Sequence, residues 1–225
     1  MIPKIIHQVW VGPDPIPKYC QDCTKTWKAL HPDYTYMLWT DNNLPDLPSD
    51  IKFFFNLHGK IKKYAFQADI LRYYVVNKFG GIYADVDIEC LKNFNNLFDE
   101  NTDLFFTVEY LDAPWLPNGI FAGAANSAFF NQIVENIITV NRHGPPFFGN
   151  EIKKYLKIDT SESGESVLEA CKNNPSIKCI LNNRSIKTLN KYYHHHYLKS
   201  WVPANEGIKV VKYGLDDNKI GKNII

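Results

Sequence analysis

The sequence predicts an α/β protein with a central, mainly parallel sheet flanked by helices. Short apolar segments alternate with helix-like segments through the first half of the chain, which is the pattern of parallel sheets with crossover helices. The chain has 225 residues, of which 45% are hydrophobic and 14% aromatic. This supply of apolar side chains suffices for one large core, so we expect a single domain over residues 1–225.

The first elements follow from runs of apolar residues and from turn signals. Residues 4–11 (KIIHQVWV) are typical of a buried strand, and a turn-rich GPDPIP follows. Residues 17–30 suit a helix that ends before His31-Pro32. Residues 34–39 (YTYMLW) predict a second strand, which the loop-forming residues 40–43 (TDNN) end.

The clearest helix is expected over residues 60–79. Its apolar residues recur on one face of a helix, at Tyr64, Ala68, Leu71, Val75 and Phe79. Gly80-Gly81 is a typical helix end. Beyond it, residues 103–110 and 119–125 predict strands and residues 127–141 predict a helix, whereas the polar residues 157–176 are expected on the surface.

The stretch Gly80–Ile88 (GGIYADVDI) alternates strictly between apolar residues and aspartates. In a strand, Tyr83, Asp85 and Asp87 share one face. Two carboxylates so close repel each other unless a cation neutralises them, and Mg²⁺ and Mn²⁺ bind one or two carboxylates together with substrate phosphates. The alternative is the polar outer face of an edge strand.

Other polar residues lie at predicted strand ends. The segments His7–Gly12, Trp39–Asn42 and Asp85–Asp87 all fall there. Parallel sheets bind ligands at the carboxyl ends of their strands, so these segments predict a ligand site.

Several segments together resemble a known family. IPKIIHQVW, YMLWTDNN and AFQADILRYYVVNKFGGIYADVDIECL are similar to the DxD-motif sugar transferases that include yeast-type α-1,6-mannosyltransferases and bacterial capsular polysaccharide transferases. The similarity covers residues 2–100 and resumes more weakly at 118–124, 143–146 and 194–201. In the C-terminal motif, Tyr197 stands where the family usually has Trp.

The resemblance implies a GT-A type nucleotide-sugar fold, a divalent cation (Mn²⁺ or Mg²⁺) and transfer with retention of anomeric configuration. It implies that residues 1–100 form the nucleotide-binding half with the DxD motif. Residues 101–225 then form the acceptor half and a C-terminal lid. By the family pattern, Asp87 binds the ion directly, whereas Asp85 contacts the ribose and the water shell of the ion.

The donor-binding residues are also expected from the family pattern. Asp69 would accept a donor hydroxyl and Arg72 would bind sugar or phosphate oxygens, for which a guanidinium is suited. The alternative for this pair is a surface salt bridge. Trp10 would stack on the base, or belong to the core instead. The remaining candidates are Asp41, Asn42 and Tyr83.

The C-terminal motif supplies three further candidates. Three consecutive histidines, 194–196, cannot all face one ion. His196 matches the C-terminal histidine of the family, so the resemblance implies that it closes the metal site. Ser200 and Trp201 would contact the diphosphate. The alternative is a set of exposed histidines. Glu109 and Asn118 are unranked candidates for contact with the sugar or the acceptor.

Composition argues against several classes of protein. The formal net charge of +1 gives no basic surface for nucleic acid. No apolar run has the length of a membrane span, and the N-terminal segment lacks the apolar stretch of a signal peptide, so a cytoplasmic protein is expected. The five cysteines do not form a four-ligand zinc pattern.

These observations predict a metal-dependent glycosyltransferase that moves a hexose from a nucleotide diphosphate sugar to a hydroxyl of a glycan or another acceptor. The resemblance favours a UDP-hexose as donor, with GDP-mannose next. Two alternatives remain: a metal-dependent nucleotide-sugar hydrolase or phosphoesterase, and a catalytically silent module that binds carbohydrate or nucleotide.

Overall fold

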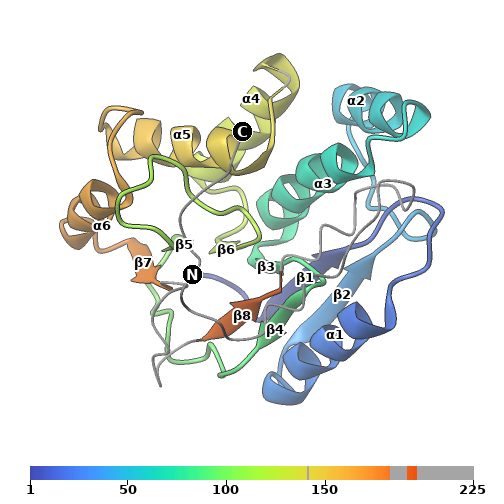
Figure 1. Cartoon of the computed structure of the whole chain (residues 1–225), viewed down its shortest axis with the longest axis horizontal. Helices are drawn as coiled ribbons and strands as arrows, with labels where there is room; N and C mark the ends of the chain where they lie inside the picture. The colour runs from blue at the N-terminus through green and yellow to red at the C-terminus, as the bar shows by residue number, and fades with distance from the viewer. Residues whose placement is uncertain (141, 183–191, 197–225) are drawn as a thin grey trace, which may run out of the picture.

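A computed structural model of the chain describes residues 1–140, 142–182 and 192–196. These residues contain a six-stranded sheet with the strand order β2-β1-β3-β6-β5-β7 (Figure 1). The strands are β1 (Ile5–Val9), β2 (Thr35–Trp39), β3 (Gly81–Ala84), β5 (Leu104–Val108), β6 (Ile120–Gly123) and β7 (Ile177–Leu181). β1 is parallel to β2 and β3, β5 is parallel to β7, and β6 is antiparallel to both neighbours. The predicted α/β class with a mainly parallel sheet is confirmed.

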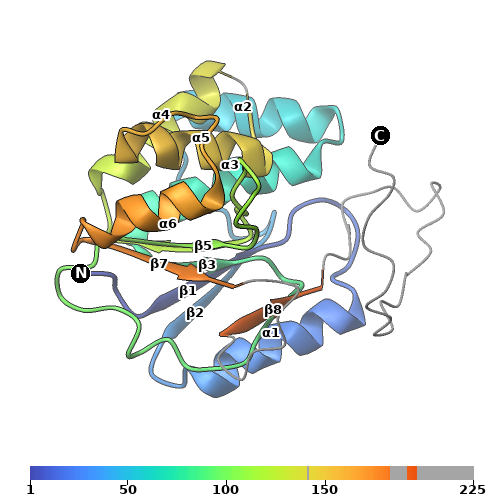
Figure 2. The same cartoon turned by 60° about the vertical axis from the view of Figure 1, so that its left-hand side comes forward.

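Helices cover both faces of this sheet. Figure 2 shows α2 to α6 on one face, with α1 and a small second sheet on the other. The second sheet pairs β4 (Ile88–Cys90) with β8 (Tyr193–His195) in antiparallel orientation. The helices are α1 (Lys18–Leu30), α2 (Ser49–Lys60), α3 (Tyr64–Phe79), α4 (Ala128–Val140), α5 (Gly144–Leu156) and α6 (Gly164–Lys172).

Each face of the sheet has its own apolar core. On β3, Tyr83 belongs to the cluster shared with α2 to α6, whereas Ile82 and Ala84 belong to the cluster shared with α1, β4 and β8. This division follows from the alternation of side chains along a strand. Both faces of β3 are therefore buried, as expected for a central strand.

The region before the DxD motif differs from the prediction. The helix expected over residues 60–79 is α3, which begins four residues later, at Tyr64, and a further helix, α2, precedes it and ends at Lys60. Between them, Lys62 takes a left-handed conformation with φ of 57°, which continues neither helix. At the other end, Gly80 has φ of 66°, so the predicted helix end at this glycine is confirmed.

The helix α3 is buried on nearly all sides. The predicted apolar stripe is only part of it, since the eight consecutive residues from Asp69 to Val76 are all buried. The cause is its position between the sheet and the neighbouring helices α2 and α4, shown in Figure 1. Any charged residue in this stretch must therefore find partners inside the protein.

Strand direction explains where the predicted ligand residues meet. The strands β1, β2, β3 and β5 run in the same direction, so their carboxyl ends lie at one edge of the sheet. Because β6 runs the opposite way, its first residue lies at that same edge, directly after Asn118 and Gly119. The segments that follow β1, β2 and β3 and the one that precedes β6 are thereby brought together.

Within the part of the chain that the structure describes, no helix has the length and apolar character needed to cross a bilayer.

Candidate donor and metal site

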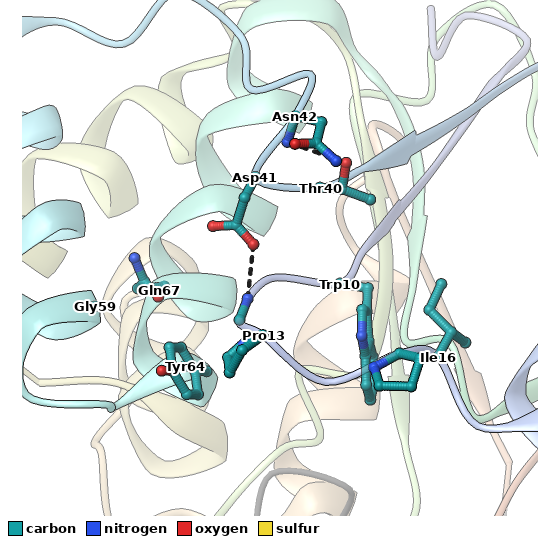
Figure 3. A pocket seen from close by; sticks show the side chains of 11 residues that line it. Trp10, Pro13, Ile16, Thr40, Asp41, Asn42, Gly59, Tyr64 and Gln67 are labelled. Atoms are coloured by element: carbon teal, nitrogen blue, oxygen red, sulfur yellow. Dashed lines mark hydrogen bonds between the residues drawn. The ribbon is translucent and has the colours of Figure 1, made fainter.

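A pocket of about 650 Å³ opens at the carboxyl ends of β1 and β2 (Figure 3). Trp10 follows β1, and Asp41 and Asn42 follow β2, while α3 contributes Tyr64 and Gln67. Its volume lies in the range of small-molecule sites. The pocket is lined by Trp10, Asp41 and Asn42, the three residues that the sequence analysis named for the nucleotide.

Hydrogen bonds fix the loop that carries Trp10. The Gly12 N–H donates to Asp41 Oδ2 at 2.8 Å, and the Trp10 Nε1–H donates to the Asp14 carbonyl at 2.7 Å. Gly12 has φ of 107°, and a Cβ there would lie 2.9 Å from the Tyr64 ring. The glycine therefore permits both the backbone conformation and the close approach of Tyr64.

The two aspartates of the motif lie in a turn, so the expectation of one strand through Ile88 is wrong. The strand β3 ends at Ala84, and the Ile88 N–H donates to the Asp85 carbonyl at 3.0 Å, which closes the turn before β4. Tyr83 and Asp85 do share a side, since the Tyr83 hydroxyl donates to Asp85 Oδ1 at 2.6 Å.

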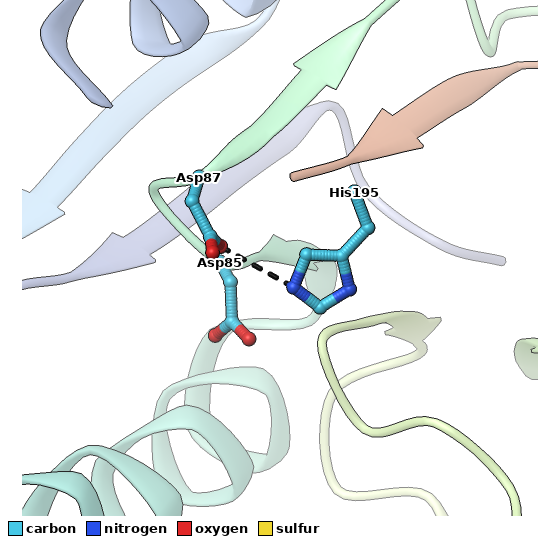
Figure 4. A group of neighbouring side chains, drawn as sticks. All are labelled: Asp85, Asp87 and His195. Carbon is cyan, nitrogen blue, oxygen red and sulfur yellow. Dashed lines mark ion pairs between the residues drawn. The ribbon is translucent and has the colours of Figure 1, made fainter. Parts of the chain in front are cut away.

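Asp85, Asp87 and His195 form a cluster that could hold a metal ion. One ligand atom from each lies within 4.8 Å of the others, and His195 Nε2 is 3.3 Å from Asp87 Oδ1. Figure 4 shows the imidazole of His195 approaching Asp87 from β8, with Asp85 beside it. The pairing of β8 with β4 sets His195 opposite Ile88, one residue after Asp87.

The histidine expected to close the metal site lies elsewhere. Sequence favoured His196, but its Nδ1 is 2.5 Å from the Tyr19 hydroxyl and its Nε2 is 3.2 Å from Glu89 Oε2. Its backbone N–H donates to the Asp87 carbonyl at 3.1 Å. The structure therefore brings His195 to the aspartates in place of His196. Ser200 and Trp201 lie outside the described residues.

Asp69 and Arg72 are buried together beneath the motif, and not on the surface. Arg72 Nη2 lies 3.3 Å from Asp69 Oδ1 and 3.2 Å from Asp85 Oδ1. Arg72 Nη1 donates to the Asn118 carbonyl at 2.7 Å, and Asn118 Nδ2 donates to Asp69 Oδ1 at 2.9 Å. The guanidinium also lies over the Tyr83 ring, 4.9 Å from its centroid. One cation thus fixes the position of Asp85.

Burial dominates the electrostatics of these carboxyls. It raises the pKa of Asp85, and the neighbouring Asp87 raises this pKa further, while Arg72 opposes both effects. Burial likewise raises the pKa of Asp69 against the influence of Arg72 and Asn118. A bound cation would act in the same direction as Arg72 and favour both ionised carboxylates of the motif.

The space around Gly119 fits a metal ion. A Cβ at this glycine would lie 2.9 Å from Asp85 Oδ2 and 3.0 Å from His195 Cε1. The backbone here does not require glycine, since Gly119 is absent from the positive-φ residues. Two carboxylates and one imidazole form a ligand set that suits Mn²⁺. Gly119 thus keeps free the space beside Asp85 Oδ2 and the His195 ring.

Two residues that build this site, Gln8 and Gly119, carried no specific sequence signal, whereas Asn118 was an unranked candidate. Gln8 donates to the Asp85 carbonyl at 3.1 Å, and Asn118 and Gly119 act through contacts made only in the folded chain. His195 could be found only by asking which member of the histidine triplet shares a side of an extended segment with the aspartates.

Two solved structures show which class of fold this is. The PaToxG glycosyltransferase superposes with a TM-score of 0.62 at 22% identity, over 75% of this chain and 74% of that one. The UDP-bound glycosyltransferase domain from the YGT toxin superposes with a TM-score of 0.52 at 11% identity, over 79% of each chain. The fold is thus of the GT-A glycosyltransferase type, as expected.

The sequence comparisons match part of the chain to a family and to yeast relatives. Residues 17–104 match the family described as glycosyltransferase sugar-binding region containing DXD motif. Inositol phosphoceramide mannosyltransferase 3 of Schizosaccharomyces pombe is 32% identical over 147 residues, which cover 64% of this chain and 40% of that protein. The initiation-specific alpha-1,6-mannosyltransferase of the same yeast is 30% identical over 101 residues, or 42% and 25% of the two chains.

Residues 17–104, which include the motif at Asp85 to Asp87, are similar to the DXD-motif glycosyltransferases, and the predicted resemblance is confirmed. The chain spans less than half the length of these two yeast relatives.

Proposed function

We propose that this chain transfers a hexose from a nucleoside diphosphate sugar to a hydroxyl of an acceptor, with retention of anomeric configuration. One observation carries the proposal. A pocket of nucleoside size and the Asp85–Asp87–His195 cluster lie at the same edge of the sheet, after strands β1, β2 and β3. This arrangement suits a ligand that has a base at one end and a diphosphate at the other.

The pocket residues would bind the nucleoside. Trp10 offers an aromatic face to the base, and its Nε1–H bond to the Asp14 carbonyl holds the ring in place. Asp41 lines the pocket and is held in place by the hydrogen bond that its Oδ2 accepts from the Gly12 N–H. These residues would position the donor before the reaction, and this positioning lowers the entropic part of the activation barrier.

Asp85, Asp87 and His195 would hold a divalent cation. A cation bound there stabilises the charge that develops on the departing diphosphate, as a Lewis acid. Arg72 holds Asp85 Oδ1 together with the Tyr83 hydroxyl, which leaves Oδ2 on the side of Gly119 and His195. Arg72 also relieves part of the repulsion between the two aspartates, so this repulsion alone does not require a cation. The cation is supported more strongly by Asp87, His195 and the space at Gly119.

The proposed reaction is a front-side displacement. The bond from the acceptor oxygen to the anomeric carbon forms as the bond from that carbon to the phosphate oxygen breaks. The departing phosphate oxygen takes the proton of the acceptor hydroxyl. The chain contributes positioning and electrostatic stabilisation, in line with the fixed Asp85 and Arg72.

The family resemblance favoured a UDP-hexose as donor, and two yeast relatives and one solved structure bear on this choice. The yeast relatives are named mannosyltransferases, which supports mannose as the sugar and GDP-mannose as a donor to test first. The UDP-bound toxin domain shares the fold, so the scaffold accommodates a uridine nucleotide as well. The acceptor is proposed only as a hydroxyl of a glycan or of another molecule.

The test is nucleoside diphosphate release from a panel of UDP- and GDP-sugars with Mn²⁺, with and without candidate acceptors. We expect release from one donor to rise with acceptor, and the product to carry the sugar in the donor's anomeric configuration by NMR. Equal release without any acceptor would favour the hydrolase alternative. Binding of a nucleotide without release would favour the silent module.

A further inference from the structure

The helix α2 exposes apolar side chains on the face opposite its buried one. Phe53 is 63% exposed, Leu57 is 41% exposed, and Ile61, at the helix end, is 56% exposed. A spacing of four residues puts them on one side of the helix. The buried residues Ile51, Phe55 and His58 lie on the other side, so the core does not explain this second apolar face.

Lysines surround these apolar side chains. Lys52, Lys60, Lys62 and Lys63 are all exposed, and residues 52–63 contain no aspartate or glutamate. Four positive charges therefore fall in twelve residues of a chain whose formal net charge is +1. Lysine can extend its charged end while its stem covers apolar surface. The segment combines the two features of helices that lie on membrane surfaces.

The position of α2 makes this face accessible. Figures 1 and 2 show α2 at the outer edge of the molecule, with α3 between it and the sheet. Gly59, in the last turn of α2, lines the nucleotide pocket. A surface bound to α2 would therefore lie beside the opening where the donor is proposed to enter.

We propose that the α2 face, made of Lys52, Phe53, Leu57, Lys60 and Ile61, docks reversibly onto an anionic lipid bilayer. The lysines complement anionic headgroups, and Phe53 and Leu57 enter the boundary between headgroups and acyl chains. A second copy of the chain is disfavoured as the occupant, because two such faces would bring four lysines together, with Lys62 and Lys63 of each copy nearby. This inference goes beyond the proposed function and does not depend on it.

The test is co-sedimentation of the full chain with vesicles of phosphatidylcholine alone and of phosphatidylcholine with 30% phosphatidylserine. We expect binding to the anionic vesicles, weakened by added salt. Phe53→Ser/Leu57→Ser should lower the partition coefficient at least tenfold. Lys52→Gln/Lys60→Gln should lower it about fivefold for each lysine. The matched controls Leu91→Ser/Leu181→Ser and Lys157→Gln/Lys172→Gln change exposed residues elsewhere and should bind as wild type.

The circular dichroism spectrum and the cooperative melting transition should be the same for wild type and both α2 variants, which shows that the variants are folded. Failure of the wild-type chain to bind anionic vesicles at low salt would overturn the proposal, as would binding that both α2 variants retain. A dimer by sedimentation velocity that Phe53→Ser/Leu57→Ser abolishes would assign the face to a second copy. None of these outcomes bears on sugar transfer, so the proposed function stands or fails separately.

Discussion

A change at Gly119 tests the metal site without replacing any of its ligands. A methyl group at Gly119 would come within 2.9 Å of Asp85 Oδ2 and 3.0 Å of His195 Cε1. We therefore expect Gly119→Ala to weaken Mn²⁺ binding about 10- to 100-fold, the usual cost of disturbing the surroundings of metal ligands.

The measurement is Mn²⁺ affinity by electron paramagnetic resonance, with the melting temperature followed in parallel. Because the backbone of Gly119 suits alanine, the variant should stay folded. Wild-type Mn²⁺ affinity in the folded variant would show that the ion is not bound at this place.

Trp10 is the residue that tests the nucleotide pocket. Stacking of a base on an aromatic ring contributes about 1–3 kcal/mol, so Trp10→Ala should cost this much binding free energy for the favoured nucleotide. Trp10→Phe keeps an aromatic face but loses the Nε1–H bond to Asp14, and should cost less. Calorimetric titration of the nucleotide measures both variants. Equal affinity in wild type and Trp10→Ala would make Trp10 a packing residue.

At the scale of elements, β8 matters because it supplies a histidine from far along the chain. His195 faces Asp87, whereas His196 contacts Tyr19 and Glu89. We expect His195→Ala to weaken Mn²⁺ binding at least tenfold and His196→Ala to change it less than threefold. The two variants are matched controls for each other, since they differ by one position in the same strand region. The reverse order of effects would restore His196 as the ligand.

The strands β1, β2 and β3 are joined by a buried neutral histidine. His7 Nδ1 accepts a hydrogen bond from Trp39 Nε1 at 3.0 Å, and His7 Nε2 therefore donates to the Gly80 carbonyl at 2.8 Å. Burial lowers the pKa of His7 to about 4. Because the buried site disfavours the protonated imidazole, protonation of His7 opposes folding. The contribution of neutral His7 to the free energy of unfolding is therefore complete above pH 6.5 and is lost as the pH falls through about 4.

At 1.36 kcal/mol per pKa unit, His7 contributes about 3 kcal/mol to this pH dependence. The His7 ring protons should titrate near pH 4 by NMR in the folded protein, and the free energy of unfolding should fall between pH 6.5 and 4. Titration near pH 6.5 would contradict the buried, neutral state.

The elements that sequence predicted best are those with strong local signals. The strands β1 and β2 and the end of α3 at Gly80 follow from apolar runs and from a glycine. The helix α2 was missed because its apolar residues occupy two opposite sides, and the break at Lys62 requires a positive φ in a residue that gives no hint of it.

The site shows the same limit. The alternation in GGIYADVDI correctly predicted that Tyr83 and Asp85 lie on the same side. Asp87 comes close to Asp85 through a turn, however, and not through a continuous strand. The positions of Asn118 and Gly119 depend on β6 running against its neighbours, which no local pattern reveals. The choice between His195 and His196 depends on the register of β8 with β4, two segments about a hundred residues apart.

At the scale of the whole molecule, the sheet, α3 and the second sheet together place a nucleoside pocket beside a carboxylate–imidazole cluster. Both α3 and β8 reach this edge from outside the large sheet, α3 with Asp69 and Arg72, and β8 with His195. Binding of one divalent cation by Asp87 and its neighbours should therefore strengthen the binding of a nucleotide in the adjacent pocket.

The most direct measurement is calorimetric titration of GDP and UDP into wild type and Asp87→Asn, each in Mn²⁺ and in excess chelator. We predict that one nucleotide binds wild type at least 100-fold more tightly in Mn²⁺ than in chelator. In folded Asp87→Asn this difference should shrink to less than tenfold. Equal affinity with and without Mn²⁺ in wild type, or an undiminished Mn²⁺ effect in Asp87→Asn, would contradict the account.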